Sequence, residues 1–138
     1  MGDLNYLVTI SRPDLAWYVN FIARNVTKPT IELRKLGTRI ISFAFNTRKE
    51  ARIEYLPWKQ DEKKPVIRVF SDSSFADRPE EGYRSTAGYL IYLNSSLVGW
   101  KSSKLKQVAT STCVAEYLAL HAAVIEAISI AYMLEESI

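Results

Sequence analysis

Cysteine and histidine are nearly absent from this sequence of 138 residues, which contains one of each, Cys113 and His121. A single cysteine excludes an intramolecular disulfide and a zinc site built from several thiolates, and it fits a reducing compartment. We expect Cys113 to be a small buried side chain at the start of a helix rather than a nucleophile. His121 has no cysteine or serine partner at a recognisable spacing, so we assign it to a helix surface or a hydrogen-bonded core position.

The N-terminus lacks the basic region followed by an uninterrupted apolar region that is typical of a signal peptide. Residues 113–134 are apolar enough to suggest a membrane span, but Glu116, His121 and Glu126 interrupt them, and each would be costly in hydrocarbon. We therefore interpret this stretch as a core helix. An intracellular location, cytoplasmic or nuclear, is the expectation.

A strong excess of one charge is also absent, because 18 basic residues stand against 15 acidic ones, giving a net charge of +3. This balance favours polyanionic partners only mildly. With 48% hydrophobic residues, the chain is long enough for one core.

The first half of the chain has helical periodicity. Apolar residues recur at helical spacing over 12–25, where Pro13 suits a first turn, and a second helix is predicted over 30–46. Residues 52–56 alternate like a half-buried strand, and a charged loop is expected over 57–65. We treat residues 1–58 as a helical linking region.

The second half, residues 59–138, has strand and hairpin signals. A strand that begins at Val66 ends at Asp72, and a polar loop follows over 78–83. Residues 86–93 and 97–101 predict a hairpin around residues 94–96. Ser111 or Thr112 is the expected N-cap of a helix that runs to about Leu134. The predicted fold class is therefore α/β (α+β), with a three-stranded antiparallel meander and a long helix, preceded by two helices.

Two carboxylates stand out in this second half, Asp72 at the predicted strand end and Glu116 at the predicted helix start. Carboxylates delivered in this way can hold a divalent metal against a phosphodiester. The alternative interpretation is that Asp72 caps a turn and Glu116 lies on a solvated face, as most acidic residues do. From these two residues alone, that alternative is favoured.

Three further stretches change that balance, Arg84–Tyr89, Val98–Lys104 and Val108–Tyr117. With the strand end at Asp72, they resemble in order and spacing the ribonuclease H region of copia-type retrotransposon polyproteins. That family has D-A-D-W-A, R-K-S-T-S-G-Y, I-S-W-K-S-K-K-Q and V-A-L-S-S-T-E-A-E-Y. Upstream, Gly2–Leu7 and Ser11–Ala16 resemble the G-x-L-x-Y-L and T-R-P-D-I-A stretches where the family's reverse transcriptase joins its ribonuclease H. The resemblance covers nearly the whole chain.

The resemblance implies the first half of a ribonuclease H fold and metal-dependent cleavage of RNA in RNA–DNA hybrids, with Asp72 and Glu116 as catalytic metal ligands for Mg²⁺ or Mn²⁺. The sequence departs from the family pattern at Ser74, Phe75, Leu105 and Val114. The family's third and fourth catalytic carboxylates have no counterpart before Ile138. We therefore expect weak metal binding, if any, and no cleavage by this chain alone.

Nucleic-acid binding requires fewer groups. The candidate contacts to nucleic acid are Arg84, Ser85, Thr86, Trp100, Lys101, Lys104 and Lys106. The alternative is that this basic segment is a solvated loop. At the level of the whole chain, the alternatives to an enzyme piece are a non-catalytic relic that binds nucleic acid or protein, and a purely structural module. An apolar strand edge beside Asp72 predicts either pairing with residues 52–56 or a homodimer built by strand addition or helix swapping.

Overall fold

The computed structural model describes residues 1–57, 64–75 and 82–137, and these form two compact units, Met1–Ile53 and Glu54–Ile138. Most of the charged loop predicted over 57–65 and of the polar loop predicted over 78–83 lies outside the described residues.

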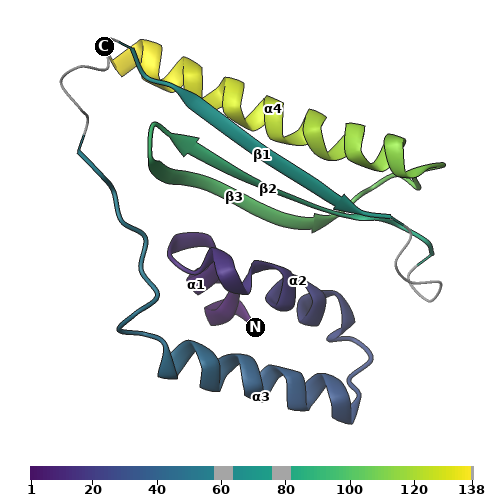
Figure 1. Ribbon diagram of the computed structural model, residues 1–138. Helices are drawn as coiled ribbons and strands as arrows, with labels where there is room; N and C mark the ends of the chain where they lie inside the picture. The colour runs from purple at the N-terminus through teal and green to yellow at the C-terminus, as the bar shows by residue number, and fades with distance from the viewer. Residues whose placement is uncertain (58–63, 76–81, 138) are drawn as a thin grey trace. The chain divides into compact units, whose positions relative to one another are not determined.

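The first unit is helical, but it contains one helix more than the sequence predicted. Helix α1 spans Gly2–Ile10, the 3-10 helix η1 spans Pro13–Leu15, α2 spans Ala16–Asn25 and α3 spans Ile31–Asn46 (Figure 1). The side-chain oxygen of Thr30 accepts a hydrogen bond of 3.1 Å from the backbone of Leu33 and so caps α3. The helices predicted over 12–25 and 30–46 are confirmed as η1 with α2 and as α3. Helix α1 was not predicted.

The missed helix α1 is explained by its packing. The buried cluster of this unit consists of Leu15, Val19, Ile22 and Ile40, contributed by η1, α2 and α3. Three partly buried side chains of α1 pack against that cluster, those of Leu4, Leu7 and Val8. Their spacing of three and four residues gives an apolar stripe on one side of a helix. That signal was present in the sequence.

Arg12 joins η1 to the end of α3. Its guanidinium donates two hydrogen bonds to the carboxylate of Asp14, of 2.9 and 2.7 Å, and reaches the carbonyl of Ala44 at 3.3 Å and the hydroxyl of Thr47 at 2.9 Å. It also lies over the ring of Phe43, 5.6 Å from the centroid. Arg12 is 3% exposed, so its charge is buried and paired.

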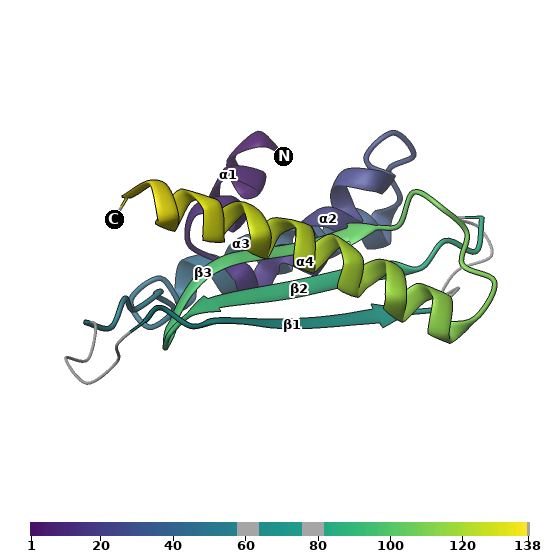
Figure 2. The same cartoon turned by 90° about the horizontal axis from the view of Figure 1, so that it is seen from above.

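The second unit is a three-stranded antiparallel meander with a long helix on one face, as predicted. Strands β1 (Ile67–Ser74), β2 (Thr86–Leu93) and β3 (Ser96–Lys104) lie in the order β1-β2-β3, and α4 spans Thr112–Ser137 (Figures 1 and 2). The hydroxyl of Ser111 accepts a hydrogen bond of 3.2 Å from the backbone of Val114, which confirms Ser111 as the cap. This arrangement is consistent with a partial ribonuclease H-like fold.

Two strands are longer than the sequence predicted. β1 continues two residues beyond Asp72, which pairs with Gly88 inside the ladder, so Asp72 is not at the strand end. β3 runs from Ser96 to Lys104, and the turn is therefore only Asn94 and Ser95, with Asn94 at a φ of 55°. The alternative that the basic segment is a solvated loop is wrong for Lys101 and Lys104, which are held in the ladder because β2 is long enough to pair with β3.

The strand predicted over 52–56 does not form. In the structure residues 51–57 belong to no helix or strand, and Leu56 is attached to Ser96 through its backbone N–H, which donates to the Ser96 hydroxyl at 2.9 Å. Alternation of polar and apolar residues does not create a strand without a partner edge to pair with. In the described part of the chain, β1 is therefore an edge strand, and the predicted local substitute for its missing neighbour was wrong.

The fully buried residues of α4 on the sheet are all small, and larger side chains such as Leu118 and Ile130 are partly buried beside them. The buried residues are Ala115, Ala119 and Ala123, which recur every fourth position. The interpretation as a core helix was wrong in extent, because Tyr117, Ile128 and other large apolar side chains of α4 are exposed. Cys113 is also exposed rather than buried. By length and composition α4 could cross a membrane, a test that core helices of soluble proteins also pass.

Candidate metal and nucleic-acid site

The two candidate metal ligands come from neighbouring elements, Asp72 from β1 and Glu116 from α4. Exposure alternates along β1, so that Ile67, Val69, Ser71 and Ser73 are half-buried while the residues between them are exposed. Successive side chains of a strand point to opposite faces of the sheet. Since Ser73 contacts a residue of α4, this alternation places Asp72 on the face opposite α4, together with Arg68 and Phe70.

Glu116 is hydrogen-bonded to Ser73, the residue next to Asp72. Its Oε1 atom accepts a hydrogen bond of 2.8 Å from the hydroxyl of Ser73 and one of 3.2 Å from the Ser73 backbone N–H. Glu116 occupies this place because the Ser111 cap fixes where α4 begins. Ser73 was not among the predicted site residues. Alternation along a strand places its side chain on the face opposite Asp72, and only its contact with Glu116 shows that this is the α4 face.

This arrangement supplies few metal ligands. Among residues 1–57, 64–75 and 82–137, no group of three or more histidine, cysteine, aspartate or glutamate side chains is placed to hold a metal ion. Asp77, the other acid close to Asp72 in sequence, lies outside the described residues. Two carboxylates can bind one hard cation with water completing its coordination, whereas phosphodiester cleavage by two metals needs more ligands.

The structure separates the candidate nucleic-acid contacts into three groups. Arg84, Lys101 and Lys106 are exposed, Trp100 and Lys104 are partly buried, and Ser85 and Thr86 are buried. Lys101 pairs with Tyr89 and Trp100 with Leu90, so the two neighbours point to opposite faces of the sheet. They therefore do not form the single aromatic and basic patch that their adjacency in sequence suggested.

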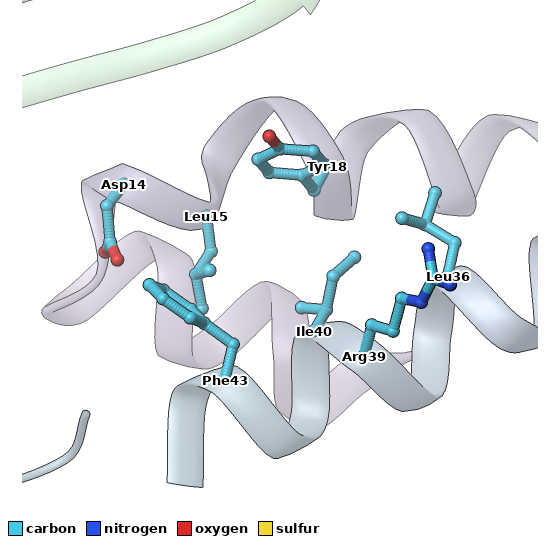
Figure 3. A pocket seen from close by; sticks show the side chains of 7 residues that line it. All are labelled: Asp14, Leu15, Tyr18, Leu36, Arg39, Ile40 and Phe43. Carbon is cyan, nitrogen blue, oxygen red and sulfur yellow. The ribbon is translucent and has the colours of Figure 1, made fainter. Parts of the chain in front are cut away.

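The first unit has a pocket of its own. It has a volume of about 320 Å³ and lies between η1, α2 and α3, and its lining is apolar apart from Asp14, Arg39 and the Tyr18 hydroxyl (Figure 3). Arg12 holds the Asp14 carboxylate and lowers its pKa by hydrogen bonding, outweighing the opposing effect of burial. This carboxylate is therefore engaged in a structural ion pair.

Comparison with known proteins provides a match over the whole chain. The chain is 30% identical over 138 residues, 99% of its length, to the Transposon Ty1-JR2 Gag-Pol polyprotein of Saccharomyces cerevisiae, and equally to the Ty1-MR1 Gag-Pol polyprotein of that yeast. The chain is related to the polyproteins of copia-type retrotransposons. This confirms the origin that the sequence motifs implied.

The retrotransposon polyproteins are much longer than this chain. The chain spans 8% of their length, so the match identifies its origin and not the activities of the whole polyproteins. No protein-family model matches the chain. No solved structure matches it either.

Proposed function

We propose that this retrotransposon-related chain carries the first part of a ribonuclease H-like domain whose complete form cleaves RNA in RNA–DNA hybrids with the help of Mg²⁺ or Mn²⁺. The observation that supports this most is the Ser73–Glu116 contact, which ties the helix carboxylate to the strand residue next to Asp72. The order of three antiparallel strands and a helix agrees with it.

In this proposal, Glu116 on the α4 side and Asp72 on the opposite face bind one weakly held cation from the two sides of the exposed β1 edge. An added divalent charge offsets the repulsion between two carboxylates and the cost of ordering them. Two carboxylates cannot position two metal ions, so the chain by itself binds metal and does not cleave. Its location is intracellular in this proposal.

Paramagnetic Mn²⁺ tests the metal site without requiring catalysis. Titration of Mn²⁺ into the isotope-labelled chain is expected to broaden amide signals of 71–74 and 114–117 first. Asp72→Asn and Glu116→Gln should each reduce this local broadening. Glu126→Gln is the matched control, because Glu126 is an exposed acid on the same helix, about 15 Å further along it. Broadening that is unchanged in both site variants contradicts the metal site.

Cleavage is tested separately with a labelled RNA–DNA hybrid in Mg²⁺ or Mn²⁺. The expected result is an intact hybrid. Robust cleavage that is abolished by Asp72→Asn would show that further ligands complete the centre.

A second candidate function is non-catalytic binding of nucleic acid. It is favoured by the exposed cations Arg84, Lys101 and Lys106 on the second unit, and by Ser74 and Val114, which stand where the family pattern has acids. Hybrid binding that is unaffected by Asp72→Asn and by removal of divalent metal, and weakened by Lys101→Ala, would support this candidate over the first.

A further inference from the structure

We propose that the sheet face opposite α4, here called the open face, binds single-stranded nucleic acid by stacking bases on Phe70 and Tyr92. The strand register brings Arg68 opposite Tyr92 and Phe70 opposite Leu90. Phe70 is 57% exposed and Leu90 37% exposed, although both are large apolar side chains inside a ladder. The open face therefore presents aromatic and aliphatic surface to solvent.

A groove gives this surface a shape. It has a volume of about 470 Å³, and its lining residues are Arg68, Phe70, Leu90, Tyr92, Asn94 and Ser95. The rings of Phe70 and Tyr92 meet edge to face, with centroids 5.8 Å apart and planes at 88°. Each ring limits the movement of the other, so little side-chain entropy remains to be lost when a planar group stacks on the pair.

The polar groups at the rim of the groove indicate an anionic partner. Arg68 donates a hydrogen bond of 3.2 Å through Nη1 to the carbonyl of Asn94, which holds its guanidinium at the end of the groove. Its remaining donors can bind a phosphate. Exposed Lys64 precedes β1, and the described lining of the groove contains no acid. Asp72 lies on the same face, two residues beyond Phe70 along β1 and outside that lining.

Among the candidate occupants, nucleic acid fits this combination best. A second apolar protein surface would cover the rings and leave Arg68 without an anionic partner. A nucleotide chain supplies planar rings and phosphates in alternation, which matches an aromatic floor beside a cationic rim. The bases must be unpaired, because the bases of a duplex already stack on one another.

Asp72, one of the two proposed metal ligands, lies on the open face, whereas Glu116 and Ser73 lie on the α4 side of the sheet. The two proposals are therefore distinguished at Glu116, which belongs to the metal site and not to the open face. Glu116→Gln should reduce Mn²⁺ broadening and leave oligonucleotide binding unchanged.

Fluorescence anisotropy with the full chain tests the open face. The probes are labelled oligothymidylate, oligouridylate and an abasic oligonucleotide of equal length, which offers phosphates without bases. Both base-containing probes should bind more tightly than the abasic one. Phe70→Leu should weaken oligothymidylate binding by roughly 5- to 100-fold, as loss of one stacked base does, and Phe70→Trp should preserve it. Arg68→Gln should lower the slope of log affinity against log salt by about 0.7.

Matched controls come from exposed residues elsewhere. Tyr117→Leu removes an aromatic ring from α4 that is 66% exposed, and Arg34→Gln removes an exposed guanidinium from α3. Neither should change oligothymidylate binding, and circular dichroism should show every variant folded. Equal affinity for abasic and base-containing probes, or for Phe70→Leu and the unaltered chain, overturns the proposal. The proposal is also overturned if the chain binds no oligonucleotide and light scattering shows a dimer that Phe70→Leu dissociates.

Discussion

Arg12 shows how a single residue can organise the first unit. It belongs to the stretch that resembles a linking motif, yet its role in the structure is packing, since it pairs with Asp14 and reaches the last turn of α3. Hydrogen bonding to Asp14 raises the pKa of Arg12, so this group stays charged at all ordinary pH values. An uncompensated guanidinium left here would be costly, because the residue is 3% exposed.

The same pair predicts how the stability of the first unit depends on pH. Hydrogen bonding from Arg12 lowers the pKa of Asp14 in the folded state below its unfolded value of about 3.9. The contribution of Asp14 to stability is therefore present above that value and is lost as pH falls through the folded pKa. Denaturant unfolding followed by circular dichroism should show this loss below about pH 4. Asp14→Asn should flatten it, and Asp3→Asn, at an exposed position, should not.

Ser73 and Glu116 lead to a second prediction for single residues. Ser73→Ala removes one of two hydrogen bonds to the Glu116 carboxylate, so the free energy of unfolding should fall by about 0.5–1.5 kcal/mol. Ser129→Ala is the control, because the Ser129 hydroxyl bonds only within α4, to the carbonyl of Ile125. Urea unfolding compares the two variants. Equal stability of both would mean that the Ser73 contact contributes nothing to the packing of α4.

At the scale of elements, the packing of α4 on the sheet depends on small side chains. Ala115, Ala119 and Ala123 are between 0% and 1% exposed, so the helix backbone approaches the strands closely. The helix could be predicted from the sequence but this face could not, because α4 is apolar on nearly every side and its periodicity marks no single stripe. Only the sheet selects which residues become buried.

Two substitutions of equal size distinguish the buried and exposed faces of α4. Ala119→Leu inserts three methylene-sized groups into a filled contact and should destabilise the second unit by about 1–3 kcal/mol. Ala122→Leu adds the same volume at an exposed position and should change stability by less than about 0.5 kcal/mol. Thermal unfolding measures both. A destabilisation by Ala122→Leu as large as that by Ala119→Leu would place the contact face elsewhere.

The contact between β2 and α4 also predicts a titration. Burial raises the pKa of the Tyr89 phenol, and the negative charge of Glu126 raises it further. In ultraviolet titration, the difference between the chain and Tyr89→Phe should show a phenol that ionises above the ordinary pKa of about 10. Glu126→Gln should lower this pKa only in part, because burial is the larger cause. A Tyr89 phenol that ionises with the exposed tyrosines would contradict the burial.

At the scale of the whole molecule, apolar surface remains uncovered. β1 is an edge strand in the described part of the chain, and large side chains of α4 such as Tyr117 and Ile128 are exposed. Exposed edges and apolar helix faces promote association with other chains. Because residues 52–56 do not form a strand, we expect a second copy of the chain to cover the unpaired edge of β1.

Light scattering over a range of concentrations tests this expectation, and a homodimer is the predicted result. Ile128→Glu should dissociate a dimer joined through α4 and leave one joined through the β1 edge intact. Ile31→Glu, at a position of α3 that is 69% exposed, is the control for added charge. A monomer at all concentrations would contradict both modes of association.

Several features could be predicted from residues near in sequence. The cap at Ser111, the hairpin and the beginning of α3 at Thr30 each follow from local chemistry, and the structure has all three. Predictions that depended on distant partners were wrong more often. Residues 52–56 alternate correctly without pairing, and Cys113 is exposed because the sheet covers a different side of α4.

The order of helices and strands in the second unit, its mixed α and β class and the retrotransposon origin follow from the amino-acid order, because capping, periodicity and motif spacing are local properties of the chain. Which side chains meet depends on the folded arrangement. Arg12 reaches the end of α3, Ser73 rather than Asp72 contacts Glu116, and Trp100 and Lys101 lie on opposite faces. The physical reason is that strand register and helix docking set these contacts, and both depend on residues far apart in the chain.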